Sequence, residues 1–212
     1  MFAMWVTLFV DDRPVTVPRG STLLEGAESA GAWVPTLCHL QDVAPRAGCR
    51  LCLVALNGEE LVASCHREAR EGDRVSTTDE RVQRVRRLVM ELLLGEHGSC
   101  PEGCELEELA SRLGVTYSRF RGGTTRPRLE PPNEYLTYDS TRCIRCDRCV
   151  RACSRQVLRR PGDRGGAIAT LGGHDQIGEP ENVCVGCGDC TSACPARALI
   201  VGRPARAIIK EG

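Results

Sequence analysis

Fourteen of the 212 residues are cysteines, and they are the residues whose type and number have the clearest chemical meaning. A chain of this length can bury a hydrophobic core without disulfide bonds, so the cysteines are not needed as a covalent scaffold. The apolar start, residues 1–10, has no basic segment before it and runs into Asp11 and Asp12, so no export signal is predicted. The cysteines therefore indicate metal ligation in a cytoplasmic protein.

Eight of these cysteines form two runs of identical spacing. Residues 143–153 read CIRCDRCVRAC and residues 184–194 read CVGCGDCTSAC, both of the form C-x2-C-x2-C-x3-C. In the bacterial ferredoxin pattern of this spacing, three cysteines of a run hold one [4Fe–4S] cluster and the fourth ligates the other cluster. The sequence therefore predicts two [4Fe–4S] clusters with crossed ligands. The two ligand sets are Cys143, Cys146, Cys149 and Cys194 for one cluster, and Cys153, Cys184, Cys187 and Cys190 for the other.

Structural zinc is the alternative for these runs, because paired C-x2-C motifs also build zinc ribbons. A zinc site uses two such pairs, whereas each run here adds a third cysteine after two residues and a fourth after three. The repeated spacing favours iron–sulfur clusters over zinc.

Four further cysteines lie in the N-terminal third of the chain: Cys38, Cys49, Cys52 and Cys65. Plant-type [2Fe–2S] ferredoxins share the C-x2-C core, but their first gap is four residues instead of ten and their last gap is longer. Four thiolates after a predicted hairpin and helix fit a [2Fe–2S] cluster, with zinc as the alternative. His39 and His66 lie beside cysteines, as the histidine ligands of a Rieske centre would, but four cysteines already complete the site.

The patterning predicts an α+β architecture with four successive segments. These are a β-grasp-like [2Fe–2S] ferredoxin domain over residues 1–78, a helical segment over 79–120, a linker over 121–133 and a two-cluster ferredoxin-like domain over 134–212. The linker is predicted because RGGTTRPRLEPPN contains two glycines and three prolines and has no periodicity.

Capping signals place the helices. Thr22 with Glu25 predicts a capping box at the start of the first helix, and Thr77 with Glu80 predicts another at the start of the second. A third, short helix is expected over residues 105–113. Strands are expected over residues 4–10, 15–17 and 53–56.

The order of these motifs resembles the electron-transfer parts of one group of oxidoreductases. The resemblance rests on PTLCHL at residues 35–40, AGCRLCLV at 47–54 and CELEELASRLGV at 104–115. The chain resembles the diaphorase small subunit of soluble NAD-reducing [NiFe]-hydrogenases and the N-terminal region of the large iron–sulfur subunit of complex I. It is also similar to the matching regions of [FeFe]-hydrogenases and NAD-dependent formate dehydrogenases. The resemblance implies an electron relay between a flavin- and NAD(P)-binding subunit and a catalytic subunit of hydrogenase or formate dehydrogenase type.

The same resemblance implies a further [4Fe–4S] cluster, held in the family by one histidine and three cysteines of the middle segment. Here that region is shortened, and His97, Cys100 and Cys104 are the ligand-type residues present. Cys104 matches the last family ligand by context, and Cys100 matches an earlier one. Two interpretations stay open: a third cube with an unusual fourth ligand, or a remnant loop without a cluster.

Composition and missing motifs argue against other roles. Lys+Arg and Asp+Glu number 28 each, so the zero formal charge gives no electrostatic basis for nucleic-acid binding. No apolar stretch approaches the roughly 18 residues of a spanning helix, so membrane insertion is not expected. The chain has no Gly-rich dinucleotide fingerprint and no P-loop, which predicts a non-catalytic subunit that docks onto its partners. The alternatives are the iron–sulfur subunit of a succinate dehydrogenase or fumarate reductase type complex, and a free-standing multicluster ferredoxin.

Overall fold

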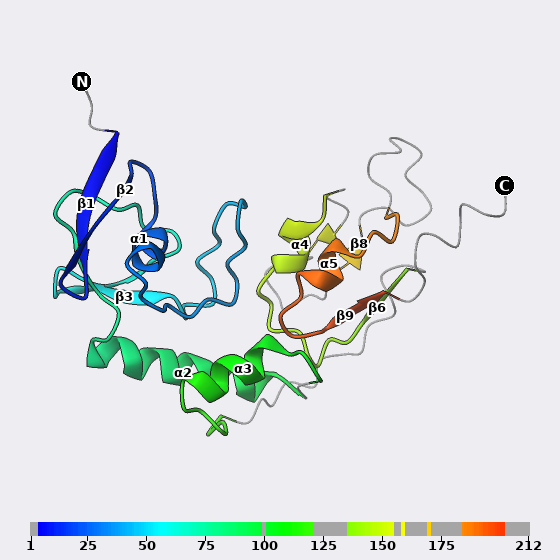
Figure 1. The fold of residues 1–212 in the computed structure, drawn as a ribbon. Helices are drawn as coiled ribbons and strands as arrows, with labels where there is room; N and C mark the ends of the chain where they lie inside the picture. The colour runs from blue at the N-terminus through cyan, green and yellow to red at the C-terminus, as the bar shows by residue number, and fades with distance from the viewer. Residues whose placement is uncertain are drawn as a thin grey trace. The chain divides into compact units, whose positions relative to one another are not determined.

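The computed structural model describes residues 4–98, 101–120, 135–154, 158–159, 169–170 and 184–201. The chain forms two compact units (Figure 1). Unit 1 comprises residues 1–93 and 108–120, and unit 2 comprises residues 94–107 and 121–212. The middle segment 79–120 therefore contributes to both units, and the predicted linker, 121–133, lies outside the described residues.

Unit 1 is built on a five-stranded mixed sheet of order β2-β1-β5-β3-β4. The strands are β1 (Trp5–Val10), β2 (Arg13–Pro18), β3 (Leu53–Leu56), β4 (Glu60–Ala63) and β5 (Arg74–Ser76). β1 pairs antiparallel with β2 and parallel with β5, while β3 pairs antiparallel with both β4 and β5. The three predicted strands are confirmed. β4 and β5 were not predicted.

The helix α1 (Leu23–Ser29) packs its apolar face against this sheet. The predicted capping box is confirmed: Thr22 Oγ1 accepts the N–H of Glu25 at 3.2 Å, and the Glu25 carboxylate accepts the N–H of Thr22 at 2.6 Å. Gly26 lies where the helix approaches β1, since a Cβ there would lie 3.0 Å from Leu8 Cδ1. α1 and β1 supply much of the buried core of unit 1, with Leu8, Leu23 and Leu24 almost fully enclosed.

The helix α2 (Glu80–Glu96) does not begin with the predicted capping box. Thr77 lies just after β5, and its hydroxyl donates to Asp11 Oδ2 at 2.6 Å while its N–H donates to Asp11 Oδ1 at 2.8 Å. Asp79 instead accepts the N–H of Arg81 at 2.8 Å. The prediction was wrong because a partner 66 residues away in sequence holds the threonine.

The helix α3 (Glu105–Arg112) confirms the third predicted helix. Gly114 follows it in the left-handed conformation, with φ +68°, and donates its N–H to the carbonyl of Ser111. Such a glycine is a common helix end, because it has no Cβ to oppose that conformation.

Unit 2 consists of short elements around its cysteines. β6 (Leu136–Tyr138) pairs with β9 (Leu199–Val201), and β7 (Leu158–Arg159) pairs with β8 (Ala169–Thr170), both antiparallel. The helices α4 (Arg148–Ala152) and α5 (Asp189–Ser192) begin inside the two cysteine runs. Cys143, Cys149 and Cys190 belong to the buried core of this unit, so sulfur atoms occupy space that apolar side chains fill in an ordinary domain.

Candidate iron–sulfur sites

The two cysteine runs of unit 2 adopt the same backbone conformation. Arg145 and Asp147 in the first run have φ values of 56° and 60°, and Gly186 and Gly188 at the matching positions have φ values of 66° and 88°. Left-handed residues at alternate positions curl a loop tightly and turn its N–H groups toward one side. The repeat seen in the sequence is therefore also a repeat in three dimensions.

The first crossed cysteine set surrounds one cavity. Cys143, Cys146 and Cys149 of the first run and Cys194 of the second line this small cavity. The rest of its wall is mostly apolar, with Ile144, Pro195, Ala196, Ala198 and Leu199. The structure thus brings a cysteine of the second run next to three of the first, as the crossed pattern predicts.

The second crossed set surrounds another cavity. Cys184, Cys187 and Cys190 of the second run and Cys153 of the first line this small cavity. Leu136, Leu158 and Val185 complete an apolar wall. Each cavity is therefore lined by three cysteines of one run and one cysteine of the other run.

Backbone donors face several of these sulfur atoms. The N–H of Arg145 lies 3.4 Å from Cys143 Sγ, and the N–H of Ala198 lies 3.2 Å from Cys194 Sγ. Burial nevertheless raises the pKa of Cys146 and that of Cys190 to about 12, and neighbouring thiols add to the increase. Cationic iron offsets the cost of four thiolates in an apolar pocket, so the donor set and its N–H groups fit [4Fe–4S] clusters. Among the described residues, no three histidine, cysteine or acidic side chains form a site for a single metal ion.

The predicted [2Fe–2S] ligands lie in unit 1, on the loops around β3. Cys38, Cys52 and Cys65 are buried, and Cys49 is partly exposed. The Sγ atoms of Cys52 and Cys65 are 3.4 Å apart, and the N–H of Cys49 lies 3.4 Å from Cys38 Sγ. Ser64 Oγ donates to the carbonyl of Cys52 at 2.8 Å and so fixes the loop that carries it.

The thiols of this group influence one another strongly. The hydrogen bond with Cys65 lowers the pKa of Cys52 to about 7, and the same contact, together with burial, raises the pKa of Cys65. Cys38 raises the pKa of Cys49 through a hydrogen bond and also raises that of Cys65 through its charge. The four sulfur atoms therefore share one electrostatic environment, as ligands of one [2Fe–2S] cluster would.

His97 and Cys104 meet in unit 2. His97 Nδ1 lies 2.8 Å from the carbonyl oxygen of Arg142, which can only accept, so Nδ1 carries the proton and donates. Nε2 lies 3.6 Å from Cys104 Sγ. Burial lowers the pKa of His97, but the hydrogen bonds with Cys104 and Arg142 outweigh it and leave the pKa raised. Cys100, the third predicted ligand, lies outside the described residues.

Ion pairs that sequence spacing did not reveal surround the first cavity. Arg148 Nη1 lies 2.7 Å from Glu105 Oε2, and Arg145 Nη2 lies 2.9 Å from Glu96 Oε2. The N–H of Glu105 also donates to the carbonyl of Pro195 at 2.8 Å. Glu96 and Glu105 are thereby joined to the first cysteine run, and Glu105 is also joined to the residue that directly follows the second run.

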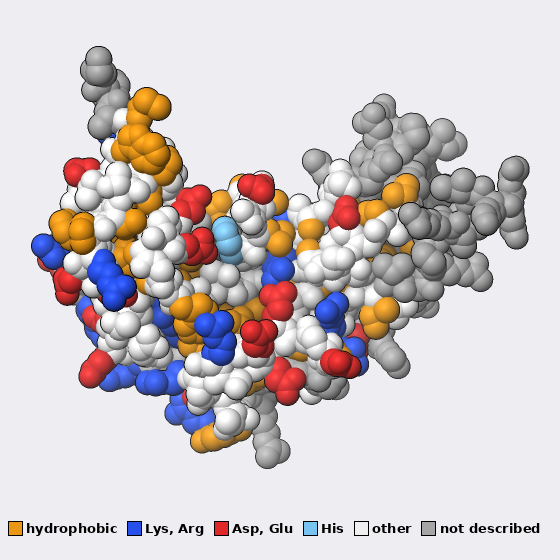
Figure 2. All heavy atoms as spheres, viewed as in Figure 1, with side chains coloured by type: hydrophobic (Ala, Val, Ile, Leu, Met, Phe, Trp, Pro, Cys, Tyr) orange, Lys and Arg blue, Asp and Glu red, His pale blue; other side chains and the backbone are white. Residues whose placement is uncertain are grey.

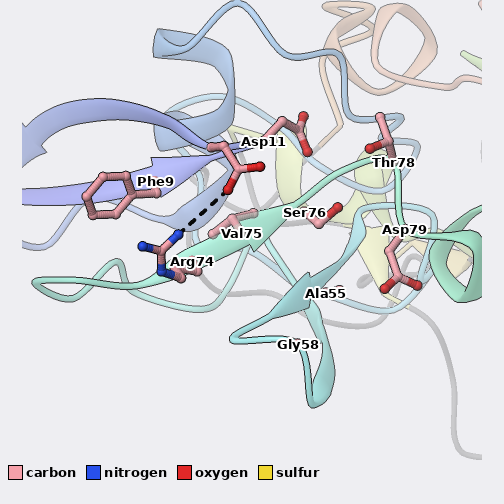
Figure 3. Close-up of a pocket in the computed structure, with 10 residues that line it drawn as sticks. Phe9, Asp11, Ala55, Gly58, Arg74, Val75, Ser76, Thr78 and Asp79 are labelled. Atoms are coloured by element: carbon pink, nitrogen blue, oxygen red, sulfur yellow. Dashed lines mark ion pairs between the residues drawn. The ribbon is translucent and has the colours of Figure 1, made fainter.

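A further hollow in unit 1 has no ligand-type sulfur or imidazole on its wall (Figure 3). Its acidic residues are held by neighbours: Asp12 lies 3.6 Å from Arg74, Asp11 accepts from Thr77, and Asp79 accepts from Arg81. We assign no site to it.

Comparison with known protein families supports the two-domain description. Residues 3–80 match the family described as a 2Fe-2S iron–sulfur cluster binding domain, and residues 142–198 match the family described as a 4Fe-4S dicluster domain. The fold and sites therefore define an α+β iron–sulfur protein with an N-terminal [2Fe–2S] ferredoxin domain and a C-terminal dicluster domain.

The relatives are subunits of oxidoreductases. The chain is 32% identical over 207 residues to the NADPH-Fe(3+) oxidoreductase subunit alpha of Geobacter sulfurreducens. This match covers 92% of this chain and 24% of that protein. It is 32% identical over 211 residues to the NADP-reducing hydrogenase subunit HndD of Solidesulfovibrio fructosivorans. This match covers 92% of this chain and 36% of that protein. The chain thus spans roughly a quarter to a third of these relatives.

A solved structure confirms the similarity over nearly the whole fold. The crystal structure of NAD+-reducing [NiFe]-hydrogenase in the H2-reduced state contains a chain that superposes with a TM-score of 0.80 at 29% identity. The match covers 93% of this chain and 87% of that chain. The resemblance inferred from the cysteine motifs is therefore confirmed.

Proposed function

We propose that this chain is a non-catalytic electron-relay subunit of a multisubunit oxidoreductase. The observation that supports it most is the pair of cavities in unit 2, each lined by four cysteines drawn from both runs. An iron–sulfur cluster, when bound, supplies one-electron transfer at a potential set by its surroundings. Crossed ligation keeps two such groups close together, as a relay requires.

The protein's own residues hold and tune these groups. In this proposal Cys38, Cys49, Cys52 and Cys65 hold one [2Fe–2S] cluster, and the two crossed sets hold two [4Fe–4S] clusters. The N–H groups of Arg145 and Ala198 stabilise negative sulfur, which favours the reduced state. Apolar walls lower the local dielectric constant around the buried cysteines Cys143, Cys149 and Cys190.

We further propose that His97, Cys100 and Cys104 hold a third [4Fe–4S] cluster. The bond from Nδ1 to the Arg142 carbonyl supports this, because histidine ligands of metals characteristically donate their second ring N–H to a carbonyl or carboxylate. The tautomer that results has the lone pair of Nε2 on the side of Cys104.

The partners in this proposal are a flavin- and NAD(P)-binding subunit and a catalytic subunit of hydrogenase or formate dehydrogenase type. The names of the NADP-reducing hydrogenase and NAD+-reducing hydrogenase relatives support this assignment. No helix in the described part of the chain is long and apolar enough to cross a membrane. In Figure 2, the described side chains of both charge signs are interspersed over the visible face. A cytoplasmic location stays a prediction.

Anaerobic reconstitution of the full chain tests the cofactor content. The measurements are iron content, acid-labile sulfide content and the paramagnetic signals after dithionite reduction. The iron content should be about ten atoms per chain for three clusters and about fourteen for four. Reconstitution with zinc alone is the control. A fully folded, colourless zinc protein with no capacity for labile sulfide would overturn the proposal.

Co-purification tests the relay role. A tagged chain from its native cell should bring down a dinucleotide-binding flavoprotein and a larger catalytic subunit. A stable monomer with clusters but without partners would instead favour the free-standing ferredoxin alternative.

A further inference from the structure

Arg86 is a buried charge in the middle of α2. Its side chain lies in the interior of unit 1, and the residue is only 1% exposed. Nη1 donates to the carbonyl of Thr77 at 3.0 Å, and Nη2 donates to the carbonyl of Leu53 at 2.7 Å. Leu53 directly follows Cys52, so the guanidinium contacts the backbone of the cysteine loop.

The hydrogen-bond partners of this guanidinium carry no charge. Its partners are two carbonyl groups, its Nε has no hydrogen-bond partner there, and no described carboxylate lies within ion-pair distance. Burial lowers the pKa of Arg86 to about 10, so the group remains a cation at neutral pH. Cys52 and Asp11 are the groups whose charge opposes that decrease. A buried cation without an ion-pair partner is costly, which indicates that a further anionic group belongs nearby.

We propose that Arg86 is the buried counter-cation of the [2Fe–2S] site and sets its reduction potential. This inference rests on the ligand assignment made under the proposed function. Thiolates and sulfide give the loaded site a net negative charge, and reduction by one electron from the partner flavin adds one more without a bond or proton change. A fixed cation beside Cys52 stabilises the reduced state more than the oxidised one. Arg86 is thus a positioning residue that acts through charge and through the Leu53 carbonyl.

The test compares variants of the full reconstituted chain. Arg86→Gln removes the charge but keeps an N–H group that can donate to a backbone carbonyl. Arg86→Lys keeps both the charge and such a donor. Arg87→Gln is the matched control, because Arg87 is the neighbouring residue on α2 and is exposed. The readout is the midpoint potential of the [2Fe–2S] paramagnetic signal in a dithionite titration with redox dyes.

Arg86→Gln should lower the equilibrium constant for reduction about tenfold, which is about 59 mV toward negative potential for one electron. Arg86→Lys and Arg87→Gln should stay close to wild type. If Arg86→Gln fails to load the cluster while Arg86→Lys loads it, the counter-charge role is supported as well.

Three results would overturn the inference. Equal potentials in Arg86→Gln and wild type would show that the charge has no influence. Equal shifts in the Gln and Lys variants, or failure of both to load, would leave Arg86 a hydrogen-bonding residue only. A wild-type chain with no [2Fe–2S] signal would refute the proposed function itself, a failure seen before any variant is compared.

Discussion

The Nε2 atom of His97 lies 3.6 Å from the Sγ atom of Cys104, while Nδ1 of the same ring is bound to the carbonyl of Arg142. Because the ring is fixed from its far side, its orientation does not depend on the proposed metal. His97→Ala should therefore lower the iron content by about four atoms per chain, from about fourteen to about ten. His97→Cys should restore it. A wild-type content of about ten atoms that His97→Ala leaves unchanged would show that this loop is a remnant.

Crossed ligation gives a pattern of non-additive losses. Cys143→Ser and Cys194→Ser each remove a ligand from the same cavity, so the double variant should lose no more iron than either single variant, about four atoms. Cys143→Ser with Cys153→Ser is the matched control, because both come from one run but line different cavities, and it should lose about eight. Iron and sulfide analysis decides between them. The opposite pattern would mean that each run holds its own cluster.

The left-handed position shared by the two runs predicts an unequal response to alanine. Gly186→Ala places a Cβ at φ +66° and 3.2 Å from Tyr135 Cδ1, so the folded protein should lose about 1–2 kcal/mol. Arg145→Ala is the control, since Arg145 already holds a side chain in that conformation. Arg145→Ala loses a half-exposed ion pair with Glu96, worth about 1 kcal/mol at most. Denaturant unfolding of the loaded chains measures both, and equal losses would contradict the strain argument.

The cysteine sites could be predicted because their information is local. Three cysteines of each cavity lie within seven residues of one another, and the repeat itself indicates the crossing. The capping box of Thr22 and Glu25 is equally local, and it is confirmed. The metal content of these sites stays a prediction.

Contacts between distant residues could not be predicted. β5 is a three-residue strand that exists because β1 pairs with it across more than 60 residues. Thr77 was wrongly assigned as a helix cap, because its hydroxyl donates a hydrogen bond to Asp11, the residue after β1. The burial of Arg86 likewise depends on a partner far along the chain, the carbonyl of Leu53, 33 residues away. Such pairings depend on the whole fold rather than on spacing.

Removal of the clusters should unfold unit 2 but not unit 1. One hydrophobic cluster of unit 2 contains eight buried described residues, three of them cysteines, and the strands of this unit have two or three residues each. The hydrophobic cluster on the five-stranded sheet of unit 1 contains fifteen buried residues. Metal binding energy therefore has to replace apolar burial in unit 2.

Hydrogen exchange measures this difference. After anaerobic chelation, the backbone amides of β6 and β9 should exchange rapidly, while those of β1 and β3 remain protected. Protection of β6 and β9 in the iron-free chain would show that unit 2 folds on apolar contacts alone.

The ion pair between Arg148 and Glu105 predicts opposite shifts of one potential. Arg148 precedes Cys149 and its side chain is 14% exposed, with Nη1 2.7 Å from Glu105 Oε2, whose side chain is 42% exposed. Arg148→Gln leaves a net negative charge beside the first cavity and should move the midpoint potential of that cluster to more negative values. Glu105→Gln leaves a net positive charge and should move it the other way. Solvent screening at Glu105 keeps each shift below the roughly 59 mV of a tenfold change.

The double variant separates charge from structure. Arg148→Gln with Glu105→Gln removes both charges together, so its potential should return close to the wild-type value if charge alone acts. Both single shifts should also shrink as salt is added, since part of the pair faces water. A shift of the potential in the same direction in both single variants would show that the pair acts by holding the Cys149 loop in place. The potential of the double variant would then shift at least as far as that of either single variant.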